Sequence, residues 1–264
     1  MNVFVGSHIG KIRENHEDNY LIGRAYLNSE KIEWLTEHKE VLVEQYNLSD
    51  NFCVAVSDGM GGHEKGEYAS YLTVKYLSDH YEEIVNDVGF DEKLRFLTRL
   101  NSYFTEESSK RIDTKDMAAT LTGVISVKRK IYGFNVGDSR LYSYSMGELK
   151  QISKDNTEGQ RLLDLGILSD DELKNFPNKK AIYKYIGIKT ELIPDIYDLT
   201  GIKQGSYLIL CSDGLSDALS KEEIQEIVQS SVLNSLEKTK GLVERAVNAT
   251  DGTGDNVTLI IIEL

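Results

Sequence analysis

The chain has 264 residues, of which 40% are hydrophobic and 28% are charged, and its formal net charge is −13. This composition is ordinary for a globular protein, and we expect residues 1–264 to form a single domain. The acidic balance argues against a nucleic-acid partner, and no apolar run is long enough to cross a bilayer, so we expect no membrane partner and a cytoplasmic location.

The spacing of apolar residues predicts strands and amphipathic helices in alternating groups. The predicted strands, in chain order, are 3–9, 19–23, 52–56, 121–127, 130–136, 140–145, 148–152, 181–188, 207–212 and 257–262. The predicted helices are a short inserted helix within 28–46, two long helices at 66–86 and 91–111, one that begins at Ser220, and one at 235–249. Tight turns join the four strands between 121 and 152, which we expect to form one antiparallel meander. Strands interrupted by paired helices predict an α+β fold with two antiparallel sheets and helices packed outside them.

The segment 153–182 is polar and carries two helix-start signals, Thr157 with Gln160 and Ser169 with Glu172. A connection of this length between strands is uncommon unless it serves as a lid or a recognition loop. We therefore expect 153–182 to be a flap beside a functional site.

Several aspartates border predicted strands. Asp58 follows the apolar run 52–56 in a Ser-Asp-Gly sequence, and Asp213 follows a second apolar strand in the same sequence. Asp255 directly precedes the last strand, and Asp18 directly precedes the second. Because antiparallel neighbours place the start of one strand beside the end of the other, these carboxylates are expected to converge at one rim.

Carboxylates crowded at one rim repel each other unless cations neutralise them. All-oxygen ligands without a cluster of Cys or His favour hard ions, so we expect Mg²⁺ or Mn²⁺ rather than Zn²⁺. Any one Asp-Gly pair is explained as well by a simple turn, and the metal prediction depends on the four occurring together.

Three further residues are expected to have structural roles. Cys53 and Cys211 lie within apolar strands and are predicted to be buried free thiols. Trp34 is interpreted as a packing residue, with a partner-binding anchor as the alternative.

Six motifs in order give the chain a family resemblance. They are Arg13-x-x-x-Glu17-Asp18, Asp58-Gly-Met-Gly-Gly-His63, Met117-Ala-Ala-Thr120, Val136-Gly-Asp-Ser-Arg140, Ser212-Asp-Gly214 and Asp255-Asn256. With these motifs the chain resembles the metal-dependent protein phosphatases, the type 2C serine/threonine phosphatases, in their small bacterial form. The resemblance covers nearly the whole chain and implies an αββα sandwich with a two-metal site at one end.

The resemblance also implies roles for individual residues. Asp58 is expected to bridge two Mn²⁺ or Mg²⁺ ions and Gly59 to lend its carbonyl, while Asp213 and Asp255 complete one ion's shell and Asp18 serves the other. Glu17 is expected to act through water, and Arg13 to bind the phosphate of the substrate. A water held between the two ions is expected to attack phosphorus directly. For Arg13, an ordinary exposed arginine is the alternative.

The sequence departs from the family pattern at several positions. Met60 stands where eukaryotic relatives carry a His that is thought to protonate the leaving group, so that role is unassigned. His63 is interpreted as a plain loop residue, and His16, where Asn is usual, is expected to alter the surroundings of Asp18. Ala118 and Ala119 replace Gly and Thr.

Four charged residues complete the interpretation of the motifs. Asp116 is the candidate for a third, weaker metal site, with Asp113 next and an ordinary solvated loop charge as the alternative. Asp138 and Arg140 are interpreted as structural.

The resulting hypothesis is a bacterial signalling enzyme that hydrolyses phosphoserine and phosphothreonine on proteins and opposes a serine/threonine kinase. A regulatory pseudophosphatase that binds phosphoproteins without turnover is the alternative. A narrow substrate range, with 28–46 as a docking element, is a refinement of the first hypothesis. The sequence names neither the substrate nor the oligomeric state.

Overall fold

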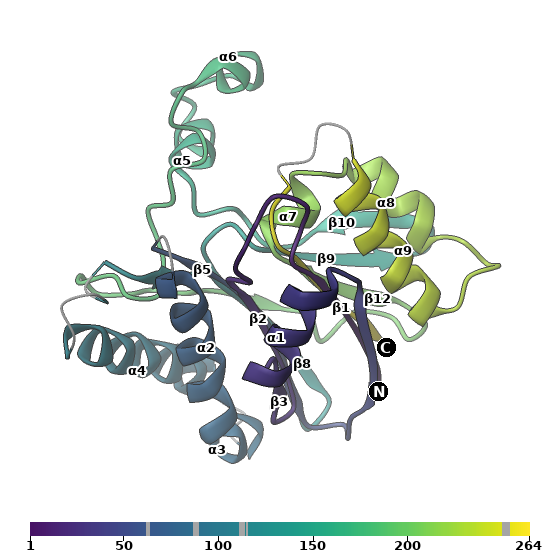
Figure 1. The fold of residues 1–264 in the computed structure, drawn as a ribbon, viewed down its shortest axis with the longest axis horizontal. Helices are drawn as coiled ribbons and strands as arrows, with labels where there is room; N and C mark the ends of the chain where they lie inside the picture. The colour runs from purple at the N-terminus through teal and green to yellow at the C-terminus, as the bar shows by residue number, and fades with distance from the viewer. Residues whose placement is uncertain (62–63, 87–89, 111–113, 115, 250–253) are drawn as a thin grey trace.

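The computed structural model describes residues 1–61, 64–86, 90–110, 114, 116–249 and 254–264 (Figure 1). Its described residues form two antiparallel β-sheets that pack face to face, with helices on both outer sides. This arrangement confirms the predicted α+β class and the αββα sandwich implied by the resemblance. None of the helices in these residues has the length and apolar character needed to cross a membrane.

The first sheet has the strand order β10-β9-β12-β13-β1-β4. Its strands are β1 (Asn2–His8), β4 (Leu42–Asn47), β9 (Arg140–Ser145), β10 (Glu148–Gln151), β12 (Tyr207–Cys211) and β13 (Val257–Glu263). The helices α7 (Asp213–Ser216), α8 (Lys221–Val228) and α9 (Ser235–Asn248) cover its outer face (Figure 1).

The second sheet has the strand order β11-β8-β7-β5-β2-β3, with β6 paired to the end of β5. Its strands are β2 (Asp18–Ile22), β3 (Ala25–Tyr26), β5 (Phe52–Met60), β6 (Ala118–Ala119), β7 (Leu121–Val127), β8 (Lys130–Val136) and β11 (Asp195–Asp198). The helices α2 (Glu64–Asp79), α3 (Tyr81–Asn86) and α4 (Phe90–Ser109) cover its outer face (Figure 1).

The strands are apolar on both faces because each sheet separates two hydrophobic cores. Along β13, Ile260 and Ile262 face the core between the sheets, whereas Leu259 and Ile261 face the core under α7, α8 and α9. A strand buried on both sides reads as a continuous apolar run, which is why these strands were predictable. Polar side chains are then confined mainly to strand ends and a few satisfied interior positions.

The predicted meander between 121 and 152 is divided between the two sheets. β7 and β8 form a hairpin in the second sheet, and β9 and β10 form a hairpin in the first. Lys128 and Arg129, and likewise Met146 and Gly147, have positive φ at both turn positions, as two-residue hairpins of this twist require. The prediction of one meander was wrong because hairpin pairing is local, whereas the β8 to β9 crossing between layers leaves no local signal.

The helix predicted within 28–46 is shorter than expected. α1 (Ser29–His38) is capped by Asn28 and ends at Lys39 in the left-handed conformation. The remainder, 42–47, is not helical but forms β4, which pairs with β1 at the edge of the first sheet. Trp34 is partly buried against the core between the sheets, which is the packing role expected of it.

Three other element predictions need correction. Residues 181–188 were expected to form a strand, but they make only isolated bridges, Thr157 to Ile182 and Ala119 to Ile186. β11 was not predicted, and the helix expected at 66–86 is divided into α2 and α3. Residues 181–188 and β11 pair with segments distant in sequence, β11 with β8, and local apolar spacing does not report such pairing.

The cap of α8 provides a test of local stability. Ser220 Oγ accepts from the Glu223 backbone N–H while Glu223 bonds back to the Ser220 backbone N–H, a complete capping box. We expect Ser220→Ala to lower the free energy of unfolding by about 1 kcal/mol in urea denaturation. Ser220→Asp, which restores an acceptor, should recover most of the loss. An equal loss in both variants would contradict this origin.

Candidate metal centre

The strand pairing brings the sequence-predicted carboxylates to one end of the sandwich. Asp18 and Asp58 are direct partners in the β2–β5 register. β12 and β13 are antiparallel neighbours, so Asp213 after the first and Asp255 before the second lie at the same end. The predicted convergence of Asp18, Asp58, Asp213 and Asp255 at one rim therefore follows from the observed topology.

A cavity of about 280 Å³ opens at this rim, and we call it the acidic cavity. It is lined by Arg13, Glu17, Asp58, Gly59, Met60, Gly61, Thr120, Asp138, Ile182, Asp213 and Asp255. Five carboxylates and one guanidinium thus share this small volume. Asp18 is 1% exposed and lies behind the wall.

Burial and mutual repulsion disfavour the charged form of these carboxylates. Burial raises the pKa of Asp18 and of Asp58 well above the usual range, and the neighbouring carboxylates raise both further. Burial and neighbouring acidic side chains raise the pKa of Asp213 to about 6 and that of Asp138 to about 7. Burial also raises the pKa of Glu17, against the opposing effect of Arg13. Such a set is stabilised as anions only when cations join it.

A buried chain of polar side chains fixes Asp18 in place. Ser212 Oγ donates to Asp18 Oδ2 at 2.7 Å and accepts from the Thr258 backbone N–H at 3.1 Å. Thr258 Oγ1 lies 2.9 Å from Ser7 Oγ, which lies 2.9 Å from His16 Nε2. His16 Nδ1 closes the ring at 3.0 Å from the Asp18 carbonyl oxygen.

The chemistry of this ring sets the state of His16. A carbonyl only accepts, so Nδ1 carries the hydrogen and Nε2 accepts from the Ser7 hydroxyl. Burial lowers the pKa of His16 to about 4, which agrees with a neutral ring. His16 thus contacts the backbone of Asp18, as expected of a residue that alters its surroundings. Sequence reasoning missed Ser7 and Thr258. The pattern that could have revealed them is that each is a polar residue within an otherwise apolar strand.

Thr120 anchors Asp58 by its backbone. The Asp58 N–H donates to Thr120 Oγ1 at 2.9 Å, and the Thr120 N–H donates to the Asp58 carbonyl at 2.8 Å. Ser139 Oγ lies 2.7 Å from Thr120 Oγ1 and supports it. The strand β5 accordingly continues past Asp58 to Met60, where it pairs with β6, rather than ending at the aspartate.

Two glycines let the backbone approach closely beside Asp58. A Cβ at Gly59 would lie 1.8 Å from the Gly66 carbonyl oxygen, and one at Gly66 would lie 2.5 Å from Glu17 Oε1. Only glycine fits either position. Gly66, in the first turns of α2, was not singled out from the sequence.

The loop that carries Arg13 and Glu17 is held by Asn256. Its Nδ2 donates to the carbonyls of Ile9 and Asn15 at 2.7 and 3.0 Å, and its Oδ1 accepts from the Glu17 N–H at 2.7 Å. Arg13 Nη2 donates to Asp255 Oδ2 at 2.8 Å, and Arg13 Nη1 lies 3.7 Å from Glu17 Oε2. The Arg13 side chain is 46% exposed, so the guanidinium lies at the mouth of the cavity.

Other sequence-predicted residues have different outcomes. Asp116 is exposed and its backbone lies near Gly61, but it does not line the acidic cavity. Asp113 and His63 lie outside the described residues. Asp138, interpreted as structural, lies in the wall of the cavity. Cys53 and Cys211 are buried free thiols, as predicted.

The residues present suit hard cations without forming a closed cage. Among the residues that the structure describes, no three His, Cys, Asp or Glu side chains gather tightly enough to hold an ion by themselves. The carboxylates line a cavity instead, so an ion here would take further ligands from the Gly59 carbonyl and from water. Mg²⁺ and Mn²⁺ commonly bind in this way, with oxygen donors and retained waters. The donor set therefore fits the expected ions.

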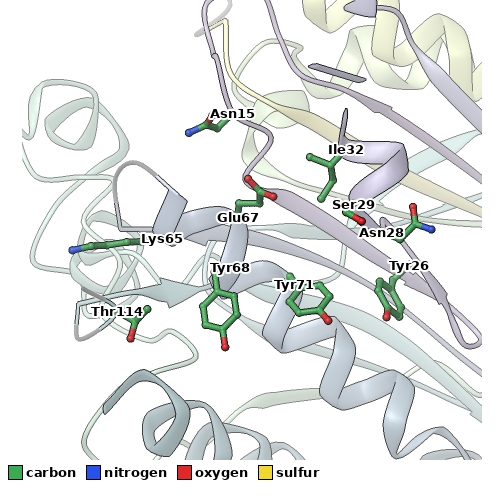
Figure 2. Close-up of a pocket in the computed structure, with 10 residues that line it drawn as sticks. All are labelled: Asn15, Tyr26, Asn28, Ser29, Ile32, Lys65, Glu67, Tyr68, Tyr71 and Thr114. Carbon is green, nitrogen blue, oxygen red and sulfur yellow. The ribbon is translucent and has the colours of Figure 1, made fainter. Parts of the chain in front are cut away.

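A larger groove, about 620 Å³, lies near the acidic cavity, since Lys65 of its lining is close to Gly61 of the cavity. It lies between α1 and the first turns of α2, where three tyrosines form one wall (Figure 2). Asn15 and Lys65 also line the groove (Figure 2). Sequence reasoning did not predict this groove, because its residues come from four separate segments.

The flap stands clear of the sheets and is fastened at its base. Its helices α5 (Glu158–Asp164) and α6 (Asp170–Asn175) project from the body, and two irregular segments of the chain connect them to it (Figure 1). Thr157 and Ser169 cap them, and Ser169 with Glu172 completes a capping box, as predicted.

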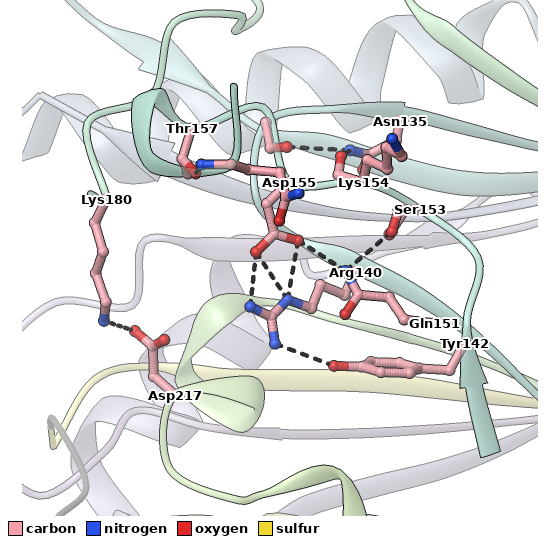
Figure 3. Close-up of polar contacts among 12 residues, drawn as sticks. Asn135, Arg140, Tyr142, Gln151, Ser153, Lys154, Asp155, Thr157, Lys180 and Asp217 are labelled. Atoms are coloured by element: carbon pink, nitrogen blue, oxygen red, sulfur yellow. Dashed lines mark hydrogen bonds and ion pairs between the residues drawn. The ribbon is translucent and has the colours of Figure 1, made fainter. Parts of the chain in front are cut away.

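Two ion pairs fasten the flap base (Figure 3). Arg140 binds both oxygens of Asp155, with Nη2 to Oδ2 at 2.7 Å and Nε to Oδ1 at 3.0 Å. Lys180, on the returning chain, pairs with Asp217 at the end of α7. Arg140 therefore has the structural role expected of it.

Arg140→Ala should weaken this attachment, because the partly buried Asp155 would lose its bidentate partner. We expect the free energy of unfolding to fall by about 2 kcal/mol and protease cleavage within 158–176 to accelerate. Arg161→Ala is the matched control, since Arg161 also pairs bidentately, with Glu158, but on the exposed surface of α5. Its effect on the free energy of unfolding should be much smaller, because exposed ion pairs contribute little to stability. Similar changes in both variants would contradict the anchoring role.

Comparison with known proteins agrees with this geometry. A family model described as protein phosphatase 2C matches residues 44–249. The serine/threonine phosphatase stp of Listeria monocytogenes is 30% identical over 221 residues, which cover 82% of this chain and 86% of that protein. The serine/threonine protein phosphatase PstP of Mycobacterium tuberculosis is 33% identical over 214 residues, which cover 80% of this chain and 40% of that protein.

Solved structures show the same fold. The catalytic domain of the phosphatase PstP in complex with two manganese ions has a TM-score of 0.70 at 27% identity, covering 99% of this chain and 98% of that one. A Streptococcus agalactiae serine/threonine phosphatase has a TM-score of 0.79 at 23% identity over 100% of both chains, a likeness that concerns the fold. With the family model matching most of its length, this chain belongs to the protein phosphatase 2C family.

Proposed function

We propose that this protein hydrolyses phosphoserine and phosphothreonine monoesters on proteins, with Mn²⁺ or Mg²⁺ in the acidic cavity. The observation that carries the proposal is the cavity itself, where five carboxylates and the Arg13 guanidinium surround about 280 Å³. Membership of the protein phosphatase 2C family, and the names of the relatives in it, support this class of reaction.

The residues around the cavity would have different roles in binding the two ions. Asp58 lines the cavity and would bridge the ions, with the carbonyl of Gly59, another lining residue, as a further ligand. Asp213 and Asp255 would complete one ion's ligands, Asp18 would serve the other, and Glu17 would act through water. When bound, the two ions would neutralise the carboxylates and supply an activated water and electrostatic stabilisation for displacement at phosphorus. Asp116, near the Gly61 turn, is proposed as the weak third site.

Arg13 would orient the phosphoryl group. Its planar fork can bind two phosphoryl oxygens, and its position at the cavity mouth leaves it accessible to substrate. In this structure the fork binds Asp255 and lies close to Glu17. A bound phosphate would compete for the same donors. The leaving-group proton has no assigned donor.

The altered Met117-Ala-Ala-Thr120 motif does not favour the pseudophosphatase alternative. Thr120, the last residue of this motif, makes two hydrogen bonds to Asp58, one through its hydroxyl and one through its backbone N–H. Ala119 pairs with Ile186 through two backbone hydrogen bonds, so the two alanines leave the strand geometry intact. The substitutions therefore give no reason to expect loss of the metal centre.

Three finer points belong to the same proposal. Opposition to a serine/threonine kinase follows from the proposed substrate. A cytoplasmic location suits two buried free thiols, since reducing compartments keep thiols unpaired. Mn²⁺ and Mg²⁺ both fit an all-oxygen site, and the preferred ion is left to measurement.

Asp58→Asn and Asp213→Asn each remove an anionic donor from the cavity. We expect each to reduce Mn²⁺-dependent hydrolysis of an aryl phosphate and a phosphopeptide by at least about 100-fold, and to weaken Mn²⁺ binding in calorimetry. Chelator should abolish wild-type turnover. Asp79→Asn, which changes an exposed aspartate paired with Lys75, is the matched control. Near wild-type turnover at low Mn²⁺ in either cavity variant would refute the assigned centre.

Arg13→Ala should mainly impair phosphate binding. We expect KM to rise roughly tenfold, with a smaller fall in kcat, because the guanidinium meets charge in the ground state and the transition state alike. Mn²⁺ affinity, measured by calorimetry, should change little. Arg24→Ala removes an exposed arginine paired with Glu82 and serves as control. Unaltered kinetics in Arg13→Ala would remove this residue from the site.

A further inference from the structure

The groove beside the acidic cavity has an aromatic wall built on rigid elements. Tyr68 and Tyr71 project from α2, Tyr26 projects from β3, and Ile32 of α1 lies opposite them (Figure 2). The Tyr26 and Tyr71 rings meet edge to face with centroids 5.9 Å apart, and those of Tyr68 and Tyr71 stack at 6.3 Å. We call this the tyrosine groove.

The tyrosine groove lies close to the acidic cavity. Gly61 lines the cavity, and a Cβ there would lie 3.1 Å from Cβ of Lys65, which lines the groove. On the other side, the Glu17 carboxylate packs against Gly66, whose neighbours Lys65 and Glu67 both line the groove. The groove is therefore within short reach of a substrate chain that leaves the cavity on this side.

The lining of the groove selects by polarity. Its charged residues are one lysine and one glutamate, and its remaining lining is neutral. The three tyrosine rings are half-buried, and burial raises the pKa of Tyr71, so its phenol stays neutral at physiological pH. Concave surfaces with aromatic walls and a few polar groups at the rim bind apolar or aromatic groups. A substrate segment that carries several charges of one sign would meet no matching set of opposite charges in this lining.

The dimensions of α2 set the reach of the groove. From Lys65 to Tyr71 the helix rises about 9 Å, at about 1.5 Å per residue. An extended peptide covers that distance with about three residues, at about 3.3 Å each. The tyrosines therefore lie where a side chain a few residues from the phosphorylated position would reach.

We propose that the tyrosine groove is a substrate subsite that takes an apolar or aromatic side chain roughly two to four residues from the phosphorylated residue. This inference rests on the proposed phosphatase function and adds the substrate class that the site prefers. Tyr71 forms the centre of the subsite because it pairs with both other tyrosines. Ser29, exposed at the rim on α1, faces the same space.

The test uses paired phosphothreonine peptides that differ only by Phe or Ala at one position, scanned across four residues on each side. We expect the wild-type ratio of kcat/KM for Phe over Ala to reach about tenfold at one or more of these positions. Tyr71→Ala removes the central ring, and Ser29→Trp fills the groove without removing a core contact. Each should bring the ratio below about twofold.

Tyr144→Ala is the matched control, because Tyr144 is also half-buried and pairs with another tyrosine, Tyr207, but on the first sheet. It should keep the wild-type ratio. A wild-type ratio near one at every position, or a preference that survives both groove variants, would overturn the proposal. Circular dichroism and melting temperature establish that each variant is folded.

Failure of the phosphatase function itself would look different. No phosphate release from any peptide or from an aryl phosphate with Mn²⁺ would overturn that function. Fluorescence anisotropy of the labelled Phe and Ala peptides then still tests the groove, because it measures binding without turnover. Tighter binding of the Phe peptide that disappears in both groove variants supports the subsite, and equal binding of the two peptides overturns it.

Discussion

Electrostatic repulsion among the carboxylates at one rim is the constraint on which this structure depends. Asp18 and Asp58 face each other across two paired strands, although burial and mutual charge both disfavour their ionised forms. Hydroxyl and backbone donors hold them: Ser212 Oγ donates to Asp18, and the Thr120 backbone N–H donates to the Asp58 carbonyl. These neutral donors fix position without cancelling charge. The cavity thereby keeps the anionic character that a pair of divalent cations requires.

The layered architecture explains why the chemistry lies at strand ends. Both faces of each sheet are covered, one by the other sheet and one by helices, so strand interiors can hold few charged groups. Polar residues that do occur inside, such as Ser7 and Thr258, satisfy one another. Antiparallel pairing then brings ends from both sheets to the same rim, which is why residues more than 200 positions apart contact each other there.

Much of this arrangement was predictable, and the exceptions share a cause. Strands buried on both faces gave continuous apolar runs, and the caps at Ser169 and Ser220 gave local signals. The division of β7 to β10 between two sheets, the strand β4 and the irregular 181–188 depend on partners distant in sequence. In the site, the carboxylates were predictable because they lie at strand ends. The closed chain of hydrogen bonds through Ser7 and His16 was not, because it depends on the register in which the strands pair. The place of Asp138 in the cavity lining was not predictable, because its motif lies in a turn that only the fold brings to the cavity.

The flap and the tyrosine groove, the two surfaces beside the acidic cavity, differ in how much conformational entropy each would lose when it binds a substrate. The flap presents exposed Leu165 and Ile167 between two short helices that project from the body, and Arg140 and Lys180 fasten its base. The tyrosine groove is built on α2, which packs along β5 and β2, and its aromatic rings already contact one another. A preformed surface loses less conformational entropy when a ligand binds than a projecting one does. Selectivity for a side chain near the phosphorylated residue therefore fits the groove, whereas the flap is better suited to contacts farther along the substrate protein.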